Sequence, residues 1–326
     1  GHGFDTDIFD LVWEAAEGFR LSYCRLLRTP WTLPPEATSA PDVAAAANMI
    51  ARGARVWPQV QTRPIDISFC FAVPSLLFIT LPSWYGIMRF NTPENILAAF
   101  KNPDIRKQLT ADATGRMALW ESLILRHVAG EANKSLVGKT LKEIAAIRDT
   151  TALDVMIDLS IEEELDAHFL AANMGHTDDA KVGALLNHDH VHLGASDGGA
   201  HILSFSTYGD TGYLFSHFVR DTGLVGLEHA VRKITSEPAA IWGIAERGAL
   251  KKGYHADITI FDAGAIARGP EYRKPDVPGD GSRYIRDAIG VEAVIINGAL
   301  AWDQAHGYAD TAHGDVVPGP TALAAE

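Results

Sequence analysis

The stretch "HVHLGASDGGAH" (residues 190–201) places an apolar run, a carboxylate, two glycines and a histidine in close succession. The apolar run predicts a short buried strand that ends just before Asp197. In parallel α/β proteins, active-site groups lie at the carboxyl ends of strands, and glycines there allow a close approach of the backbone. Asp197 therefore suits either a pocket carboxylate, which ligates a metal or takes a proton from bound water, or a plain turn residue.

The amino-terminal residues alternate between strand and helix patterns, as expected of an α/β chain. Residues 41–53 carry apolar residues at helical spacing, with Pro41 at the start and Gly53 at the end. The segment "ARVWPQVQTRP" (54–64) follows as a strand that ends in a loop, and residues 19–27 form an earlier strand candidate.

The periodicity weakens from residue 65 to about residue 136, where Pro, Trp and Phe are frequent. We expect a long insertion over the mouth of a site there, and assign no strands to it. Its aromatic part, residues 68–90, either roofs the site and selects apolar groups, or forms core or a subunit interface. Residues 139–165 predict two short helices, capped by Thr140 and by Thr150 or Thr151.

The pattern changes again near residue 245. Residues 227–243 predict two helices separated at Pro238, and the second helix ends at Gly243. Beyond them come short strands, and Asn297-Gly298 between "AVII" and "ALAW" predicts a tight hairpin.

Composition restricts the class of partner. The 326 residues carry a formal net charge of −13 without a basic stripe, which argues against nucleic acid or an anionic membrane and favours a small molecule or another protein. Cys24 and Cys70 have neither disulfide-framework nor metal-site spacing, so a reducing, cytoplasmic compartment is expected. No apolar run reaches the length of about 18 residues that a membrane helix needs.

Three ordered segments, residues 193–201 ("LGASDGGAH"), 230–262 and 291–302, resemble the carboxyl-terminal part of the metal-dependent amidohydrolase superfamily, in the group of the N-acyl-D-amino-acid deacylases. The resemblance implies an α/β fold, a TIM-like (β/α)8 barrel with a small β-sandwich domain. It implies that residues 1–245 hold the barrel part, with the insertion at about 65–136, and that residues 246–326 hold the small β-domain and tail. It also implies Zn²⁺, one or two ions, or another divalent metal, with Asp197 as ligand and general base.

Other site residues follow from the same resemblance. In "SYCR", Tyr23 stands where relatives carry a metal-binding His, and Tyr is a poor zinc ligand; Arg25 stands at the anion-binding Lys. His2 is a candidate for the fifth-strand metal ligand. His201 stands where some relatives also carry His, and either contacts substrate or is structural. Apart from the resemblance, Arg63 before Pro64, at the end of a predicted strand, is another candidate anion clamp or a solvated residue.

The His-x-His motif of the first barrel strand does not occur near the amino terminus. Credible strands suffice for about half a barrel, those around 19–24, 54–60 and 190–196, with another at the amino terminus or near 166–172. We therefore expect a carboxyl-terminal portion of a longer chain, a partner chain, or a homo-oligomer that completes the barrel. The predicted function is hydrolysis of amide or cyclic amide C–N bonds; the alternative is a non-catalytic subunit or degenerate relative.

Overall fold

A three-stranded parallel sheet forms the part of the chain that matches the expected barrel. The computed structural model describes residues 21–26, 40–52, 56–89, 91–174, 177–194, 209–279 and 281–317. Within them the strand order is β1-β2-β6, and both pairings are parallel. The bounds are β1 (Leu21–Leu26), β2 (Val56–Val60) and β6 (His192–Leu193), with helix α2 (Ala40–Ala51) between β1 and β2. The parallel pairing confirms the α/β character of this region.

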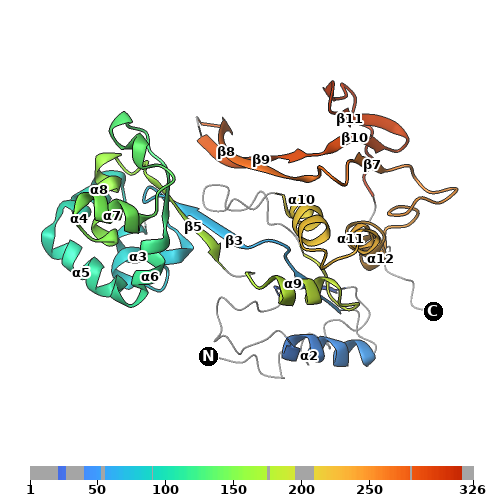
Figure 1. The fold of residues 1–326 in the computed structure, drawn as a ribbon, viewed down its shortest axis with the longest axis horizontal. Helices are drawn as coiled ribbons and strands as arrows, with labels where there is room; N and C mark the ends of the chain where they lie inside the picture. Colours follow the sequence, from blue (N-terminus) through green and yellow to red (C-terminus); the bar gives the residue numbers. More distant parts are fainter. Residues whose placement is uncertain are drawn as a thin grey trace.

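Residues 65–174 form a unit that we call the helical lobe. It contains an antiparallel sheet of order β3-β5-β4 and a group of helices on one side of the molecule (Figure 1). The strands are β3 (Ile65–Phe69), β4 (Ile124–His127) and β5 (His168–Met174); the α-helices are α3 (Pro82–Met88), α4 (Pro93–Lys101), α5 (Pro103–Ala113), α6 (Met117–Ser122), α7 (Leu141–Arg148) and α8 (Ala152–Glu162), with short 3-10 turns at η2 (Leu76–Phe78), η3 (Thr114–Arg116) and η4 (Glu131–Leu136).

The aromatic stretch of residues 68–90 is the core of the helical lobe. Phe71, Phe78 and Trp84 are completely buried and pack against one another, with ring centroids 5.2–5.6 Å apart. The indole of Trp84 donates a hydrogen bond of 2.9 Å to the backbone oxygen of Leu109. Of the alternatives for this stretch, the described side chains therefore show core packing.

Two strand expectations for this region were wrong. Residues 65–136, where the sequence pattern predicts no strands, contain the strands β3 and β4. The possible barrel strand near 166–172 is β5, but it pairs antiparallel with β3 and β4 and so belongs to the helical lobe. The reason is that period-2 patterning marks a strand without naming its partner, and here the partners lie within the insertion.

The helix caps of the helical lobe agree with the sequence. Thr140 caps α7 in a capping box, in which its hydroxyl accepts from the backbone N–H of Glu143 and the Glu143 carboxylate accepts from the Thr140 backbone. The hydroxyl of Thr151 caps α8 by accepting from the backbone N–H of Asp154. Two capped helices, rather than one long helix, are confirmed.

A second hydrophobic core lies under the parallel sheet and is separate from the core of the helical lobe. Its helices are α9 (Asp179–Leu186), α10 (Asp210–Tyr213), the π-type helix η5 (Leu214–Asp221) and α11 (Leu227–Ile234), and α12 (Ser236–Trp242) follows α11 in the chain. Gly243 ends α12 with a φ of 69°, as predicted. Pro238 lies within the first turn of α12 rather than at the break, which falls at Thr235.

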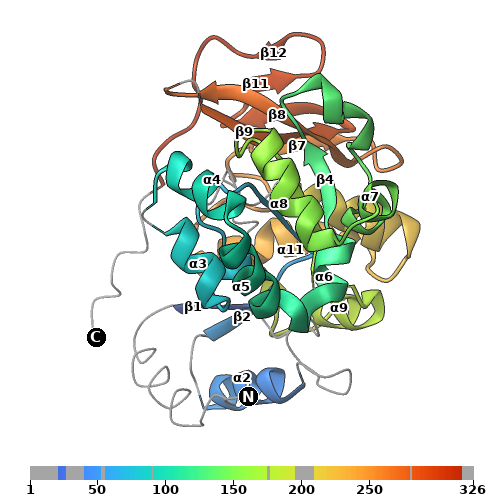
Figure 2. The ribbon, with the colours of Figure 1, turned by 90° about the vertical axis from the view of Figure 1, so that its left-hand side faces the viewer.

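The carboxyl-terminal residues form two antiparallel units, seen above the helices in Figures 1 and 2. One is a four-stranded sheet of order β12-β11-β10-β7, and the other is a long two-stranded ribbon, β8–β9. The bounds are β7 (Ile258–Phe261), β8 (Ala267–Val277), β9 (Gly281–Ile289), β10 (Val291–Ile296), β11 (Ala299–Asp303) and β12 (Gly307–Tyr308). Asn297 and Gly298 both have positive φ and join β10 to β11, which confirms the predicted hairpin. The limits of the domains and the β-sandwich stay predictions.

No helix in the described ranges is long and apolar enough to cross a membrane.

Candidate functional site

The parallel sheet directs the carboxyl ends of its strands to one edge. The register aligns Val60 of β2 with Leu193 of β6, so the residues that follow both strands start side by side. Gly194 continues this pairing with a hydrogen bond of 2.9 Å to the backbone oxygen of Val60. A Cβ at Gly194 would come within 3.0 Å of Oε1 of Gln59, so glycine permits this close passage. The segment that leads to Asp197 therefore leaves the sheet beside the end of β2.

Arg63, three residues after β2, forms a buried ion pair with Asp210 of α10. The two side chains are 1% and 5% exposed. Thr62 adds a second link, because its hydroxyl donates a 3.0 Å hydrogen bond to the backbone oxygen of Asp210. Burial raises the pKa of Asp210, and the charge of Arg63 opposes this rise. The carboxyl end of β2 is thus bonded to the start of α10.

The motif "GDTGY" (residues 209–213) brings the β8–β9 ribbon against α10. Gly209 has a φ of 92°, and a Cβ there would lie 2.6 Å from Cβ of Arg268 in β8. A Cβ at Gly212 would lie 2.7 Å from the backbone nitrogen of Arg268, closer than a real Cβ can come. The guanidinium of Arg268 lies over the ring of Tyr213, 4.7 Å from its centroid. The two glycines and Tyr213 therefore position Arg268 beside Asp210.

Five charged residues meet at this place, and we call them the Arg63 cluster: Arg63, Asp66, Asp210, Arg268 and Arg286. Burial is the main cause that lowers the pKa values of Arg268 and Arg286. The charge of Arg63 lowers both further, Arg286 also lowers the pKa of Arg268, and the charge of Asp66 opposes the shift in both. Asp66, in β3, also accepts a 3.0 Å hydrogen bond from the backbone nitrogen of Asn173. Arg286 also pairs with Glu271 at 3.4 Å, so arginines and carboxylates alternate in this poorly solvated place.

The far half of the ribbon contacts the helical lobe through a second polar network. Arg126 pairs with Glu271, and its guanidinium lies 3.6 Å from the ring centroid of Tyr284. The Tyr284 hydroxyl lies 3.2 Å from Nδ1 of His168, whose Nε2 lies 3.0 Å from Oδ1 of Asp166. Burial lowers the pKa of His168 to about 4, so the ring is neutral at pH 7. Its Nε2–H then donates to Asp166, and its Nδ1 accepts from Tyr284.

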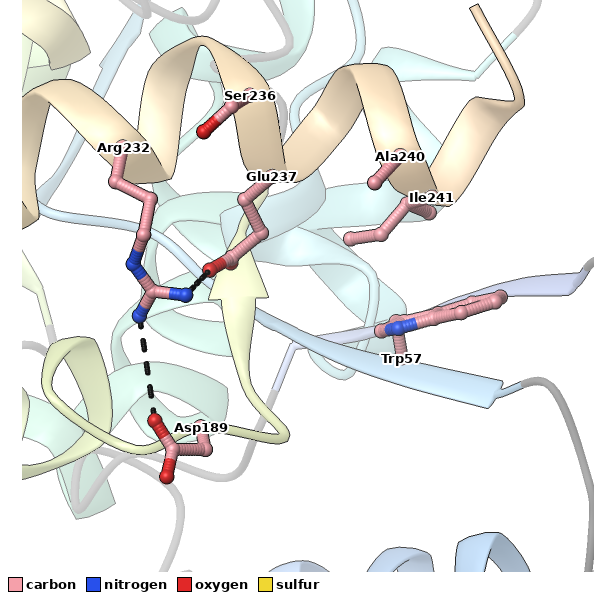
Figure 3. Close-up of a pocket in the computed structure, with 7 residues that line it drawn as sticks. All are labelled: Trp57, Asp189, Arg232, Ser236, Glu237, Ala240 and Ile241. Atoms are coloured by element: carbon pink, nitrogen blue, oxygen red, sulfur yellow. Dashed lines mark ion pairs between the residues drawn. The ribbon is translucent and has the colours of Figure 1, made fainter.

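A cavity of ≈ 340 Å³ lies at the opposite end of the parallel strands (Figure 3). Trp57, the second residue of β2, and Asp189, which precedes β6, line it. In Figure 3, Arg232 reaches between Glu237, at 3.2 Å, and Asp189, at 4.0 Å. Lys233, 2% exposed, pairs with Glu237 at 3.0 Å and donates to backbone oxygens before β6. These charges hold the amino-terminal ends of the strands, the end of a parallel α/β sheet that serves stability rather than chemistry.

The structure places only some of the predicted site residues. Arg63 is buried in the Arg63 cluster, and Arg25 lies in β1, where the backbone alone is described. Asp197, His201 and His2 lie outside the described residues. Within the described ranges, no group of three or more His, Cys, Asp or Glu side chains is placed to hold a metal ion.

Comparison with known proteins decides the family. The sequence profile of the amidohydrolase family matches residues 116–301, more than half of the chain. The chain belongs to the amidohydrolase family.

Two curated relatives from Alcaligenes xylosoxydans xylosoxydans show how far the similarity extends. A D-aminoacylase is 31% identical over 171 residues, which is 52% of this chain and 32% of that protein. An N-acyl-D-aspartate deacylase is 29% identical over 177 residues, which is 51% of this chain and 33% of that protein. The chain thus spans about a third of the length of these relatives.

Two solved structures also align with this amidohydrolase chain. A crystal structure of D-aminoacylase has a TM-score of 0.47 at 22% identity. The alignment covers 85% of this chain and 46% of the D-aminoacylase chain. The N-acyl-D-glutamate deacylase from Bordetella bronchiseptica, complexed with zinc and a phosphonate inhibitor, has a TM-score of 0.49 at 18% identity. The alignment covers 92% of this chain and 50% of the deacylase chain.

Sequence reasoning missed three residues of the Arg63 cluster: Asp210, Arg268 and Arg286. A signal for Asp210 was present, because two glycines three residues apart flank an aspartate in "GDTGY" and indicate a close backbone contact there. Arg268 and Arg286 carried no such signal. They are two of several arginines in a polar segment, and only the pairing of β8 with β9 turns them toward α10 and β3.

Proposed function

We propose that this chain is part of a metal-dependent hydrolase that cleaves amide or cyclic amide C–N bonds. The observation that carries the proposal is the family match over residues 116–301, which includes the Asp197 motif. The named deacylase relatives support the same bond type. The described geometry adds that the segment leading to Asp197 and the Arg63 cluster start from neighbouring strand ends.

In this proposal Asp197 is the central residue. A divalent ion such as Zn²⁺, one or two per site, with Asp197 and His2 among its ligands, would lower the pKa of a water molecule. Asp197 accepts the proton of the attacking water and returns it to the leaving nitrogen. Arg25 and His201 contact the substrate.

Arg63 contributes to substrate binding through its charge. It is 1% exposed and bonded to Asp210, so its effect on a substrate is electrostatic rather than a direct contact through solvent-exposed atoms. A further segment or chain, or a second copy, supplies the remaining barrel strands.

Hydrolysis by the natural full-length polypeptide, loaded with zinc, tests this function. The panel contains N-acyl-D-amino acids, hydantoins and aromatic amides, and metal content per chain is measured on the same sample. We expect hydrolysis of at least one class, and a loss of 10²- to 10⁴-fold in rate for Asp197→Asn reloaded with metal. The matched control is Asp221→Asn, an exposed carboxylate 56% accessible, which should keep the parent rate.

Two outcomes contradict the proposal. A metal-free protein without hydrolysis of any substrate would favour the non-catalytic alternative. Parent-like turnover of Asp197→Asn would return Asp197 to the role of a turn residue.

A further inference from the structure

We propose that an acid-sensitive latch, made by Arg273 of the β8–β9 ribbon with His127 and Asp166 of the helical lobe, holds the turn end of the ribbon to the lobe. The latch is closed at neutral pH. Protonation of His127 opens it, because the charged ring takes the Asp166 carboxylate from Arg273. The latch is independent of the proposed hydrolase activity.

The closed latch contains a neutral histidine. Nη1 of Arg273 lies 2.9 Å from Nε2 of His127, the last residue of β4. A guanidinium has hydrogen-bond donors and no acceptor, so Nε2 of His127 accepts this bond and carries no proton. A hydrogen bond from a charged donor is stronger than one between neutral groups. The neutral ring of His127 therefore helps to bind the ribbon to the lobe.

Asp166, two residues before β5, is a second lobe partner of Arg273. Nη1 of Arg273 lies 3.5 Å from Oδ1 of Asp166. Nε2 of His127 lies 3.7 Å from Oδ2 of the same carboxylate, and Nε2 of His168 lies 3.0 Å from its Oδ1. One carboxylate thus lies near one arginine of the ribbon and two histidines of the lobe.

A proton on Nε2 of His127 would reverse its contact with Arg273. Two N–H donors, both on cations, would face each other across the 2.9 Å that a hydrogen bond now spans. The charged ring has another partner close by, because Asp166 belongs to the same lobe and lies 3.7 Å away. His127 then pairs with Asp166, and Arg273 loses both of these contacts with the lobe.

Other charged or titratable groups reach the latch from the elements packed against it: Arg126 of β4, His168 of β5, Glu271 of β8, Tyr284 of β9 and Cys70 after β3. Burial lowers the pKa of Arg126 to about 10 and raises the pKa values of Cys70 and Tyr284, so these three keep their charge between pH 7 and pH 5. Burial also lowers the pKa of His168 to about 4, which leaves that ring mostly neutral at pH 5.

His127 is the histidine of the latch that is open to solvent. Its side chain is 33% exposed, whereas that of His168 is 7% exposed. Histidine is also the side chain that ordinarily changes its charge between pH 5 and pH 8. A permanent contact would need only an ion pair of Arg273 with Asp166, yet Arg273 lies closer to His127 than to the carboxylate.

Only one end of the ribbon depends on the latch. Arg273 pairs with Tyr284 across the ribbon, close to the turn that joins β8 to β9. The ribbon extends from above α10 toward the helical lobe in Figure 1. Its other end has separate contacts, since Arg268 lies over the ring of Tyr213 in α10. Acid therefore frees the turn end from the lobe while the other end stays on α10.

Hydrogen exchange of the full-length polypeptide, followed by mass spectrometry at pH 7 and pH 5 and corrected for the intrinsic rate at each pH, tests the latch. The measured quantity is the protection of residues 271–277 and 281–286 relative to that of α8, which reports unfolding of the lobe itself. We expect this relative protection to fall at least tenfold from pH 7 to pH 5, because a charge-assisted hydrogen bond is lost.

Two variants separate the latch from a general effect of acid. His127→Gln keeps an oxygen that accepts from Arg273 but cannot be protonated, so the ribbon should stay protected at pH 5. Arg273→Met removes the ribbon's side of the latch, and its protection at pH 7 should already be as low as that of the parent at pH 5.

The matched control is His306→Gln, at a histidine whose side chain is 83% exposed. It should lose ribbon protection at pH 5 as the parent does. Equal ribbon protection of the parent at both pH values, an equal loss in His127→Gln and the parent, or a loss in α8 as large as that in the ribbon would overturn the latch.

Discussion

Arg63 and Asp210 form a buried ion pair that links the end of β2 to the first turn of α10. Thr62 strengthens the same junction through its hydrogen bond to Asp210. Because α10 in turn touches β8 through its glycines, one ion pair connects the parallel sheet, the helical segment and the ribbon. The Arg63 cluster therefore depends on contacts between segments that are far apart in the sequence.

Asp210→Asn should lower the free energy of unfolding by about 3–5 kcal/mol, because Arg63 would stay buried without its counter-charge. The double variant Arg63→Met with Asp210→Leu should lose less than Asp210→Asn alone, since both charges disappear together. Urea unfolding of the single and double variants measures the coupling. Equal losses for the exposed control Asp221→Asn and for Asp210→Asn would contradict this account.

Gly212→Ala should destabilise the chain by about 1–3 kcal/mol, since the new Cβ would collide with the backbone of β8. Gly86→Ala should have the opposite effect on the free energy of unfolding. It lies in α3 with nothing within 4 Å of its added Cβ, so alanine should stabilise by about 0.5–1 kcal/mol. Thermal unfolding and proteolysis of the ribbon measure both; a stable ribbon in Gly212→Ala would show that the close contact is dispensable.

Stability should fall between pH 6.5 and pH 4 because of His168. Its pKa is about 4 in the folded chain, against about 6.5 in the unfolded chain, so the unfolded state binds more protons in this window. The stabilisation is complete above the unfolded pKa and is lost as the pH falls toward 4, by about 2 kcal/mol at pH 5.

His168→Asn should flatten this pH dependence, which urea unfolding at pH 7 and pH 5 would show. The matched control is His306→Asn, at an exposed histidine whose side chain is 83% accessible, and it should keep the pH dependence of the parent. A His168→Asn protein with the same drop as the parent would assign the pH dependence to other groups.

Metal stoichiometry should respond to residue 23. The family resemblance implies a metal-binding His at the position of Tyr23, so we expect Tyr23→His to raise the number of zinc ions bound per chain. Atomic absorption after dialysis against buffered zinc measures it, with Tyr308→His, at an 86% exposed position, as the control. Unchanged occupancy in Tyr23→His would remove this position from the metal site.

The sequence by itself determined the elements whose stability is local. The caps at Thr140 and Thr151, the stop at Gly243 and the Asn297-Gly298 hairpin all lie where the residues predicted them. Each depends on contacts within a few residues, so the residue types suffice. The ordered motifs around Asp197 also sufficed to find the family.

Only the tertiary structure decided which strands pair and which charges meet. The pattern of residues 166–172 fitted a strand but not its antiparallel partners, β3 and β4, because strand patterning is the same for any partner. Likewise Arg268 and Arg286 are ordinary polar residues along the chain. They become part of the Arg63 cluster because the pairing of β8 with β9, and the absence of side chains at Gly209 and Gly212, bring them near Asp66 and Asp210. In this poorly solvated place, interactions between charges are stronger than at the surface.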